Sequence, residues 1–292
     1  MIPTKKHQPA ILPGLHDRVC VITGGAGIIG RAICESLAAS GIKSAILDIN
    51  SDAATQLAAK LELQYGTRCI GVTANVLDRE SLEQAKIIVE TELGPVDFLI
   101  NGAGGNSPKA TTGAEVYGRT FESSPHGSYS TIFDLEISGF QGVFDLNFTG
   151  TLLPCQVFGE GMAERGRGVI LNISSMNSFR PLTKIPAYSA AKASVNNFTQ
   201  WLAVHLAQAG VRVNAIAPGF FLTDQNRFLL IDKETGEPTA RGNKIIANTP
   251  MGKYGQPENL QGAVLFLLSD LSAFITGVIL PVDGGYSAYG GV

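Results

Sequence analysis

The sequence has few of the features that mark membrane, secreted or metal-dependent proteins. Its four cysteines, Cys20, Cys34, Cys69 and Cys155, are widely spaced and form no CxxC pair. They indicate neither a zinc site nor a disulfide framework, and buried free thiols in a reducing cytoplasm are expected. The four histidines form no HExxH pattern, which leaves metal catalysis unsupported. No segment offers about 18 uninterrupted apolar residues, and the N-terminal MIPTKKHQPAILPG lacks an apolar core, so neither membrane insertion nor secretion is expected.

Charge is also sparse. Charged residues make up 16% of the chain, and 22 Lys and Arg against 25 Asp and Glu give a net charge of -3. The cations are scattered, so nucleic acid is not an expected partner. By contrast, 45% of the 292 residues are hydrophobic and no composition break divides the chain. These properties predict a single domain over residues 1–292 with one large core, preceded by an extension over residues 1–16.

Seven short apolar runs rich in Val, Ile and Leu recur along the chain. Such runs are typical of strands buried on both faces of a parallel sheet. Segments with helical spacing alternate with them, which predicts an α/β fold of the doubly wound Rossmann type, with a mostly parallel seven-stranded sheet and helices on both faces. The expected strands are 18–23, 44–49, 69–76, 97–102, 168–175, 212–219 and 277–284, and the expected helices are 30–40, 53–65, 81–93, 140–164, 187–209 and 257–269.

Two stretches, 104–134 and 220–249, lack clear periodicity. A long irregular segment inside a compact domain is usually either functional or disordered. Both stretches follow predicted strand ends, the side on which open α/β sheets bind ligands. We therefore expect them to be walls of a substrate pocket, with inert surface loops as the alternative.

A glycine-rich turn follows the first expected strand. The segment Thr23-Gly-Gly-Ala-Gly-Ile-Ile-Gly30 contains GxGxxG at Gly25, Gly27 and Gly30 and leads into a helix. Without side chains such a turn can tighten, and its N–H groups can approach a pyrophosphate at the helix N-terminus. Asp48 ends the second expected strand, where an acid can bind the adenosine ribose hydroxyls and repel a 2'-phosphate. The pattern favours NAD over NADP, and the alternative is a solvated strand-end carboxylate.

Several motifs in one order give the chain a family resemblance. They are Thr23 to Gly30, Asn101-Gly-Ala-Gly104, Asn147, Ser175, Tyr188-Ser-Ala-Ala-Lys192 and Pro218-Gly219. In this order they resemble the short-chain dehydrogenases/reductases along nearly the whole chain. The resemblance implies a catalytic set of Asn147, Ser175, Tyr188 and Lys192. Ser175 is preferred to Ser174 because the family's serine stands 13 residues before its tyrosine.

The resemblance also implies the residues that contact the coenzyme, although two positions depart from the family pattern. TGxxxGxG would place a glycine at Ile28, and Asn75-Val76 stands where Asp-Val is common. In the family, Ala103 backs the adenosine half and Thr223 holds the nicotinamide carboxamide. The implied NAD-binding residues are Thr23, Gly24, Gly25, Gly27, Ile28, Ile29, Asp48, Asn75, Val76, Asn101, Ala103, Gly104, Tyr188, Lys192, Pro218, Gly219 and Thr223.

Tyr188 and Lys192 stand four residues apart and therefore share one helix face. A nearby ammonium favours the phenolate and is expected to lower the tyrosine pKa, so that Tyr188 can serve as a general acid or base. Ser175 would bind the substrate oxygen, and Asn147 would orient a water that connects Lys192 to solvent. Taken singly, a helix Tyr usually serves packing and a helix Lys usually lies on a solvated face. Their joint occurrence in this order of motifs favours catalysis.

The resemblance narrows to a branch that interconverts D-mannonate and D-fructuronate in bacterial hexuronate breakdown. It is carried by NISSMNSFRPLTKIPAYSAAK (172–192), NAIAPGFFLTDQNRFLL (214–230) and the tail PVDGGYSAYGGV. Another polyol or gluconate-type dehydrogenase and a non-catalytic dinucleotide sensor remain alternatives. A serine acyl enzyme is a weaker one, since the SxxK at Ser189 to Lys192 is joined by no SDN, KTG or GxSxG.

A sugar-acid substrate needs a partner for its carboxylate. Arginine offers a fork that matches this group in two hydrogen bonds. Arg180 lies five residues beyond Ser175, while Lys109 and Arg227 lie in the two irregular stretches. These three, with Ser175 and Asn177, are the expected substrate-binding residues. The family resemblance and the aromatic, glycine-rich tail 286–292 further imply a homotetramer.

Overall fold

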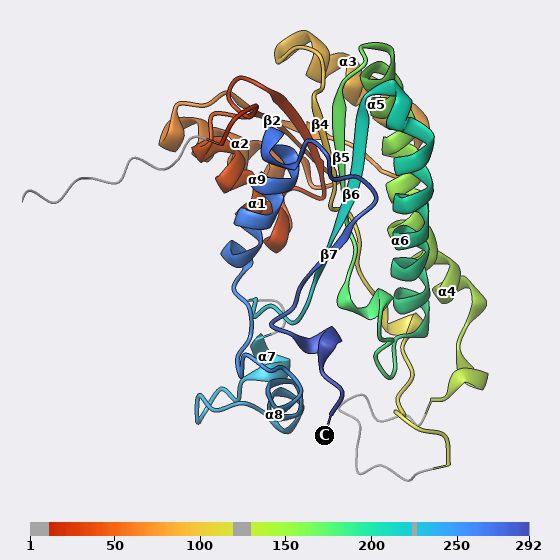
Figure 1. Ribbon diagram of the computed structural model, residues 1–292. Coiled ribbons are helices and arrows are strands. Elements are labelled where there is room, and N and C mark those ends of the chain that lie inside the picture. Colours follow the sequence, from red (N-terminus) through yellow and green to blue (C-terminus); the bar gives the residue numbers. More distant parts are fainter. Residues whose placement is uncertain (1–11, 119–129, 224–226, 292) are drawn as a thin grey trace, which may run out of the picture.

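Seven strands form one sheet in the order β3-β2-β1-β4-β5-β6-β7 (Figure 1). The computed structural model describes residues 12–118, 130–223 and 227–291. Every neighbouring pair of strands is parallel, so the predicted seven-stranded Rossmann-type sheet is confirmed, and the described part of it is wholly parallel. The strands are β1 (Val19–Thr23), β2 (Lys43–Asp48), β3 (Cys69–Thr73), β4 (Phe98–Asn101), β5 (Gly168–Ile173), β6 (Val211–Pro218) and β7 (Ile279–Val282).

Helices cover both faces of this sheet. Alternate residues of a strand point to opposite faces, and β1 shows it, since Cys20 and Ile22 pack in one core cluster while Val19 and Val21 pack in the other. The first cluster also contains residues of α1 (Ile28–Ala39), α2 (Ser51–Tyr65) and α9 (Gln261–Leu268). The second contains residues of α3 (Arg79–Glu92), α5 (Gly150–Glu164) and α6 (Pro186–Leu206).

Local sequence explains where several helices begin. The side chain of Asn50 accepts a hydrogen bond from Ala53 N and caps α2, and Asp78 caps α3 in the same way. Proline at the first position of α6 removes an N–H that would have no partner there. The expected helix 140–164 is three segments, α4 (Ile137–Phe144), a π-helical turn (Asp145–Thr149) and α5. The apolar spacing could not show this interruption.

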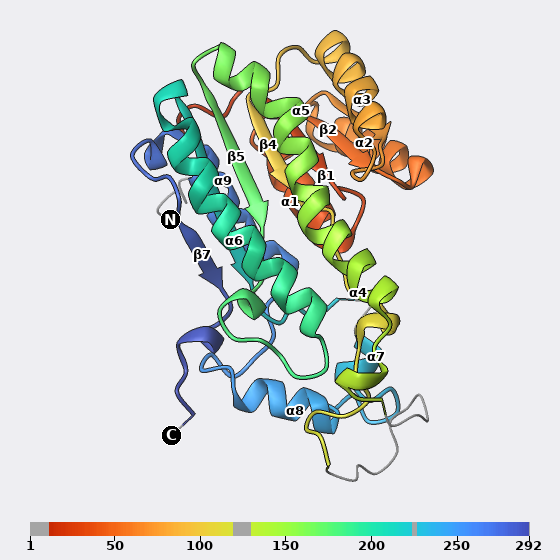
Figure 2. The ribbon, with the colours of Figure 1, turned by 90° about the vertical axis from the view of Figure 1, so that its right-hand side faces the viewer.

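The stretch 220–249 contains two short helices, which the sequence pattern did not predict. They are α7 (Arg227–Leu230) and α8 (Ala240–Ala247), and Thr239 caps α8 by accepting a hydrogen bond from Gly242 N. Figure 2 shows that both helices lie beyond the carboxyl ends of the strands. The segment before α4 and the C-terminal turn, residues 283–289, lie at the same end. The stretch is therefore a partly helical layer over this end of the sheet.

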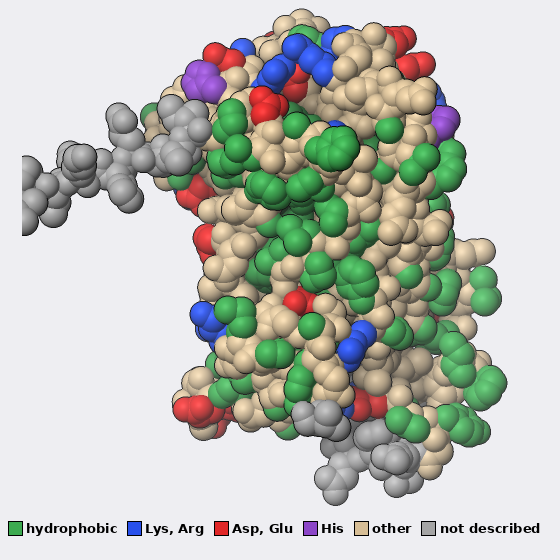
Figure 3. All heavy atoms as spheres, viewed as in Figure 1, with side chains coloured by type: hydrophobic (Ala, Val, Ile, Leu, Met, Phe, Trp, Pro, Cys, Tyr) green, Lys and Arg blue, Asp and Glu red, His purple; other side chains and the backbone are tan. Residues whose placement is uncertain are grey.

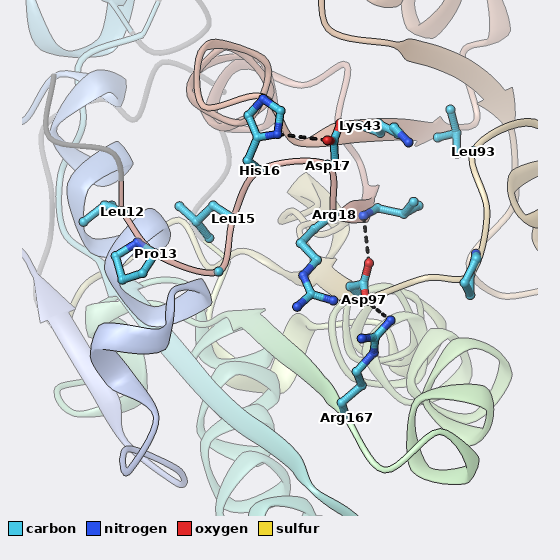
Figure 4. A pocket seen from close by; sticks show the side chains of 13 residues that line it. Leu12, Pro13, Leu15, His16, Asp17, Arg18, Lys43, Leu93, Asp97 and Arg167 are labelled. Carbon is cyan, nitrogen blue, oxygen red and sulfur yellow. Dashed lines mark hydrogen bonds and ion pairs between the residues drawn. The ribbon is translucent and has the colours of Figure 1, made fainter. Parts of the chain in front are cut away.

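The amino ends of the strands carry a different feature. Asp97, just before β4, is 8% exposed, and its Oδ1 lies 3.1 Å from Arg18 Nη1 and 3.6 Å from Arg167 Nη2. Its Oδ2 accepts a hydrogen bond from Val19 N. These residues border a cavity of about 530 Å³ at this end (Figure 4). Because both arginines are paired with Asp97, we assign the cluster to stability.

The predicted free thiols are confirmed, since all four cysteines are buried and unbridged. Among the described residues, no group of His, Cys, Asp and Glu has the arrangement of a metal site, and no helix combines the length and apolarity needed to cross a bilayer. Most of the predicted extension 1–16, as well as residues 119–129 of the first irregular stretch, lies outside the described residues.

Candidate active site

The glycine turn after β1 is shaped by close backbone approach. Gly24 has φ +63, a left-handed conformation that favours glycine, and a Cβ there would lie 2.8 Å from Ala103 Cα. A Cβ on Gly30 would overlap the carbonyl oxygen of Gly24. Ile28 replaces the expected family glycine without strain, because it is the first residue of α1 and has helical backbone. The turn thus keeps glycine at the two positions where a side chain would collide with backbone.

A cavity of about 590 Å³ opens over this turn at the carboxyl ends of the strands. Most of the predicted coenzyme contacts border it, from the carboxyl ends of five strands. These are Gly24, Gly27, Ile28, Ile29, Asp48, Asn75, Val76, Ala103, Gly104, Gly219 and Thr223. Sequence reasoning missed further lining residues because nothing in their local pattern signals the cavity, namely Ile49, Ala74, Gly102, Leu146, Phe220 and Phe221. Gly30 of the glycine motif also borders the cavity, although it is not among the predicted NAD-binding residues.

Asp48 lies at the edge of the cavity with its carboxylate held in place. Its Oδ2 accepts a hydrogen bond from Ala26 N at 3.1 Å, and its Oδ1 accepts one from Asn50 N at 3.0 Å. Each oxygen keeps capacity for a further donor. The carboxylate is therefore oriented by the glycine turn itself.

Thr23, Gly25, Asn101 and Pro218 are buried behind the cavity and do not border it. Thr23 Oγ1 accepts hydrogen bonds from the backbone N–H of Gly102 and Ala103. Asn101 Nδ2 donates to Asn172 Oδ1 at 2.8 Å. In this structure the side chains of Thr23 and Asn101 join neighbouring strands, so they support the cavity from behind.

Lys192 is anchored beneath Tyr188 on α6. Its Nζ donates a hydrogen bond to Ile173 O at 2.7 Å and lies 5.7 Å from the centre of the Tyr188 ring. Lys192 is 4% exposed. Burial lowers its pKa from 10.5 to about 8. The ammonium is thus held close to the phenol in a desolvated environment.

The expected lowering of the Tyr188 pKa is wrong for this structure. Burial raises the pKa of the phenol, and a hydrogen bond with the Ser175 side chain opposes this effect only in part. The spacing along the helix indicates the neighbouring charge but not the desolvation of the ring. As placed here, Tyr188 favours its protonated form.

Ser175 follows the end of β5 and begins a short turn, Met176–Ser178. Its Oγ accepts a hydrogen bond from Asn177 N at 3.2 Å and also interacts with Tyr188. The neighbouring Ser174 is engaged elsewhere, since its Oγ donates to Asn196 Oδ1 at 2.5 Å. The geometry therefore supports the choice of Ser175.

Asn147 is fully buried in the π-helical turn before α5. Its Nδ2 donates to Gly105 O at 2.7 Å and to Val143 O at 2.8 Å, and its Oδ1 accepts from Gly105 N at 3.2 Å. A Cβ on Gly104 would lie 2.7 Å from Asn147 Oδ1 and 3.3 Å from Lys192 Nζ. Asn147, Gly104 and Lys192 therefore meet at one point, where the amide fixes the loop after β4.

The expected substrate-binding residues lie on different elements. Arg180 is exposed, and its Nη1 donates to Tyr289 O at 2.5 Å in the C-terminal turn. Lys109 packs against Gly139 of α4, and Arg227 begins α7. Asn177 is 6% exposed and its Oδ1 has no partner among the described residues. Of the three basic candidates, Arg180 is the one that lies in the loop after Ser175.

Comparison with known proteins identifies the family. A model described as enoyl-(acyl carrier protein) reductase matches residues 24–287. An uncharacterized oxidoreductase of Haemophilus influenzae is 48% identical over 95% of this chain and 96% of its own length. An uncharacterized oxidoreductase of Bacillus subtilis is also 48% identical, over 95% of this chain and 98% of its own length. The chain therefore belongs to the short-chain dehydrogenase/reductase family of NAD(P)-dependent oxidoreductases.

Solved structures agree with this assignment. A Haemophilus influenza protein with a proposed D-mannonate oxidoreductase activity, solved with bound NAD, is 49% identical with a TM-score of 0.88, over 96% of this chain and 98% of the other. A gluconate 5-dehydrogenase from Burkholderia cenocepacia, in complex with NADP and tartrate, is 28% identical with a TM-score of 0.80, over 94% and 97% of the two chains.

Proposed function

We propose that the protein is an NAD-dependent dehydrogenase of a sugar acid and interconverts D-mannonate and D-fructuronate. The observation that carries the proposal is the meeting of Ser175, Tyr188 and Lys192 beside a cavity with a dinucleotide-type glycine turn. The narrower substrate is supported by the resemblance of the segments around these residues to the D-mannonate branch. It is also supported by the neighbour with a proposed D-mannonate oxidoreductase activity.

The cavity fits a dinucleotide in shape and chemistry. Gly24 and Gly30 remove the side chains that would fill the turn, and the Asp48 carboxylate stands at the edge with lone pairs to accept from ribose hydroxyls. A carboxylate there disfavours a 2'-phosphate, so we assign NAD as the coenzyme. When bound, its nicotinamide ring accepts or supplies the hydride exchanged with the substrate carbon. Gly219 and Thr223 would border that half of the coenzyme.

The chain's own residues move the proton. Tyr188, whose protonated form is favoured by burial, gives its proton to the carbonyl oxygen in reduction and regains it from the hydroxyl in oxidation. Ser175 donates a hydrogen bond to the same oxygen, where charge develops. Lys192 stabilises the phenolate that remains. Asn147 fixes the loop at Gly104 and Gly105 next to Lys192.

Two alternatives remain distinct from this proposal. A gluconate-type dehydrogenase is favoured by the likeness to the Burkholderia cenocepacia enzyme. A non-catalytic dinucleotide sensor would bind NADH without turnover. The presence of Ser175, Tyr188 and Lys192 together argues against this alternative.

Purified protein with NAD should be assayed on D-mannonate, D-gluconate and D-mannitol. Fastest turnover on D-mannonate supports the proposal, preference for D-gluconate supports the first alternative, and tight NADH binding without turnover supports the second.

We also propose that the stretches 104–134 and 220–249 are walls of the substrate pocket. Lys244 of α8 forms an ion pair with Glu115 at 2.8 Å, which joins the two stretches directly. If the two stretches were inert surface loops, no contact between them would be expected. The ion pair, which lies beyond the carboxyl ends of the strands, therefore favours the pocket wall. Proteolytic cleavage at the exposed turn 232–236, which does not border the dinucleotide cavity, should weaken sugar-acid binding before it affects NADH binding.

A homotetramer is the proposed assembly. Figure 3 shows hydrophobic side chains gathered over α9 and β7. Phe266 of α9 is exposed, as are Leu271, Phe274 and Val278 in the segment between α9 and β7. A patch of this kind usually marks a protein contact, and β7 is an edge strand of the sheet. Light scattering should give four times the chain mass, and a monomer would refute the assembly.

A further inference from the structure

The C-terminal turn lies against the mouth of the candidate site. Gly219 lines the dinucleotide cavity, and a Cβ on it would lie 2.6 Å from Asp283 Cα. The Asp283 carboxylate accepts backbone hydrogen bonds from residues two and four positions later, which fixes the turn. The Tyr286 ring packs edge-on against Phe220, with 5.2 Å between ring centres, and Phe220 lines the same cavity. Tyr286 therefore supports, through Phe220, the wall of the cavity.

Two cations approach the turn that carries Tyr286. Arg180 reaches the turn from the loop after Ser175 and donates to Tyr289 O. Burial raises the pKa of Tyr286, while the positive charges of Lys244 and Arg180 act on it in the opposite direction. The β5–α6 loop thus reaches this turn through Arg180, and the segment after α8 reaches it through Met251, whose N–H donates to Gly284 O at 3.1 Å.

The charged groups around Tyr286 have a net positive charge. Lys244 pairs with Glu115, whose pKa is lowered chiefly by that hydrogen bond and further by Lys184 and Arg241. With Arg180 counted, four cations stand against the carboxylates of Glu115 and Asp283, which gives a net charge of +2. The Asp283 carboxylate also accepts two backbone hydrogen bonds within its own turn. An incoming anion therefore meets an excess of positive charge at the entrance.

We propose that Tyr286, Arg180 and Lys244 form the carboxylate-binding subsite of the substrate pocket, an inference that rests on the sugar-acid dehydrogenase function proposed above. A carboxylate has about four lone-pair positions and takes donors from several directions. The phenol supplies one O–H, the guanidinium keeps N–H groups beyond the one bound to Tyr289, and the ammonium supplies charge. A neutral polyol lacks the charge that these groups recognise.

The matched substrate pair for a test is D-mannonate and D-mannitol, since the latter has a hydroxymethyl group in place of the carboxylate. The variants are Tyr286→Phe and Lys244→Gln, with Tyr289→Phe and Lys233→Gln as controls of the same chemistry on the same two segments. NADH binding measured by fluorescence checks that each variant is folded. Both subsite variants should raise the KM for D-mannonate by about tenfold or more, as expected for a hydrogen bond to a charged group. The KM for D-mannitol and the behaviour of the controls should stay near those of the wild type.

The result has three readings. Loss confined to the acid and to the two subsite variants supports the inference. If wild-type protein oxidises D-mannonate but both subsite variants match their controls, or lose activity equally on acid and polyol, the subsite is overturned while the proposed function stands. If the wild type prefers D-mannitol to D-mannonate, the proposed function fails, and the subsite fails with it.

Discussion

The ammonium of Lys192 donates a hydrogen bond to the carbonyl oxygen of Ile173, 2.7 Å away, and so ties α6 to the last residue of β5. This contact sets the distance between the helix that carries Tyr188 and the strand end that carries Ser175. Because Lys192 is 4% exposed, its charge is screened little by solvent. The geometry of proton transfer therefore depends on one buried cation.

Replacement of Tyr188 by Phe removes the proton donor and keeps the ring. We expect turnover to fall by more than about a hundredfold, the scale of general acid–base catalysis, while NADH binding persists. Steady-state kinetics and a fluorescence titration with NADH measure the two quantities. Near-normal rates in this variant would exclude Tyr188 as the acid.

The pH dependence of stability should reveal the burial of Lys192. Its folded pKa of about 8 lies below the unfolded 10.5, so between these values the unfolded chain binds more protons and stability rises with pH. The free energy of unfolding of the wild type relative to Lys192→Met should therefore increase by about 2 kcal/mol from about pH 7.5 to about pH 9.5. Urea unfolding at both pH values measures it. A constant difference would show that the ammonium is not desolvated.

Coenzyme choice should follow Asp48. Replacing it by Ser removes the carboxylate that disfavours a 2'-phosphate, and we expect the preference for NAD over NADP to fall by about tenfold or more, or roughly 1.4 kcal/mol. Comparison of kcat/KM for the two coenzymes measures the change. Asp52→Ser, at an exposed position of α2, is the control. A wild type that already prefers NADP would contradict the role of Asp48.

Asn196 is expected to be a positioning residue. It accepts a hydrogen bond from Ser174 and donates one to Ser178 Oγ at 2.7 Å, and Ser178 in turn donates to Ser175 O. Asn196→Ala removes one hydrogen-bond partner from Ser174 and one from Ser178, the residues on either side of the Ser175 turn. It should lower kcat by about tenfold with little change in the coenzyme KM. Asn197→Ala, at the exposed neighbouring position, should have no effect. Equal losses in both variants would argue against positioning.

Asp97 should contribute to stability without affecting catalysis. The Asp97 carboxylate accepts from Val19 N and pairs with two arginines, Arg18 and Arg167, as Figure 4 shows for the arginines. Asp97→Ala leaves these three groups without that acceptor. We expect a loss of about 2 kcal/mol in the free energy of unfolding. Glu83→Ala breaks an exposed pair with Arg79 and should cost about 0.5 kcal/mol or less. A change in the substrate KM of the Asp97 variant would link this end to the site.

Apolar runs and glycine positions in the sequence were sufficient to predict the sheet, the glycine turn and Asp48. A parallel strand is buried on both faces, and a tight turn excludes side chains, so both leave a direct record in residue type. The order of motifs likewise indicated Ser175, Tyr188 and Lys192 before any geometry was known. These features depend on residue type and on spacing along the chain.

Other properties arose only when distant segments packed together. The π-helical turn at Asn147, the desolvation that raises the Tyr188 pKa, and the burial of Thr23 and Asn101 depend on neighbours far away in sequence. The same holds for Arg180, whose contact with Tyr289 spans 109 residues. Burial and long-range contact have no signature in local spacing, because they are set by how the elements pack. Tertiary structure alone therefore decided which charges and polar groups face the mouth of the site.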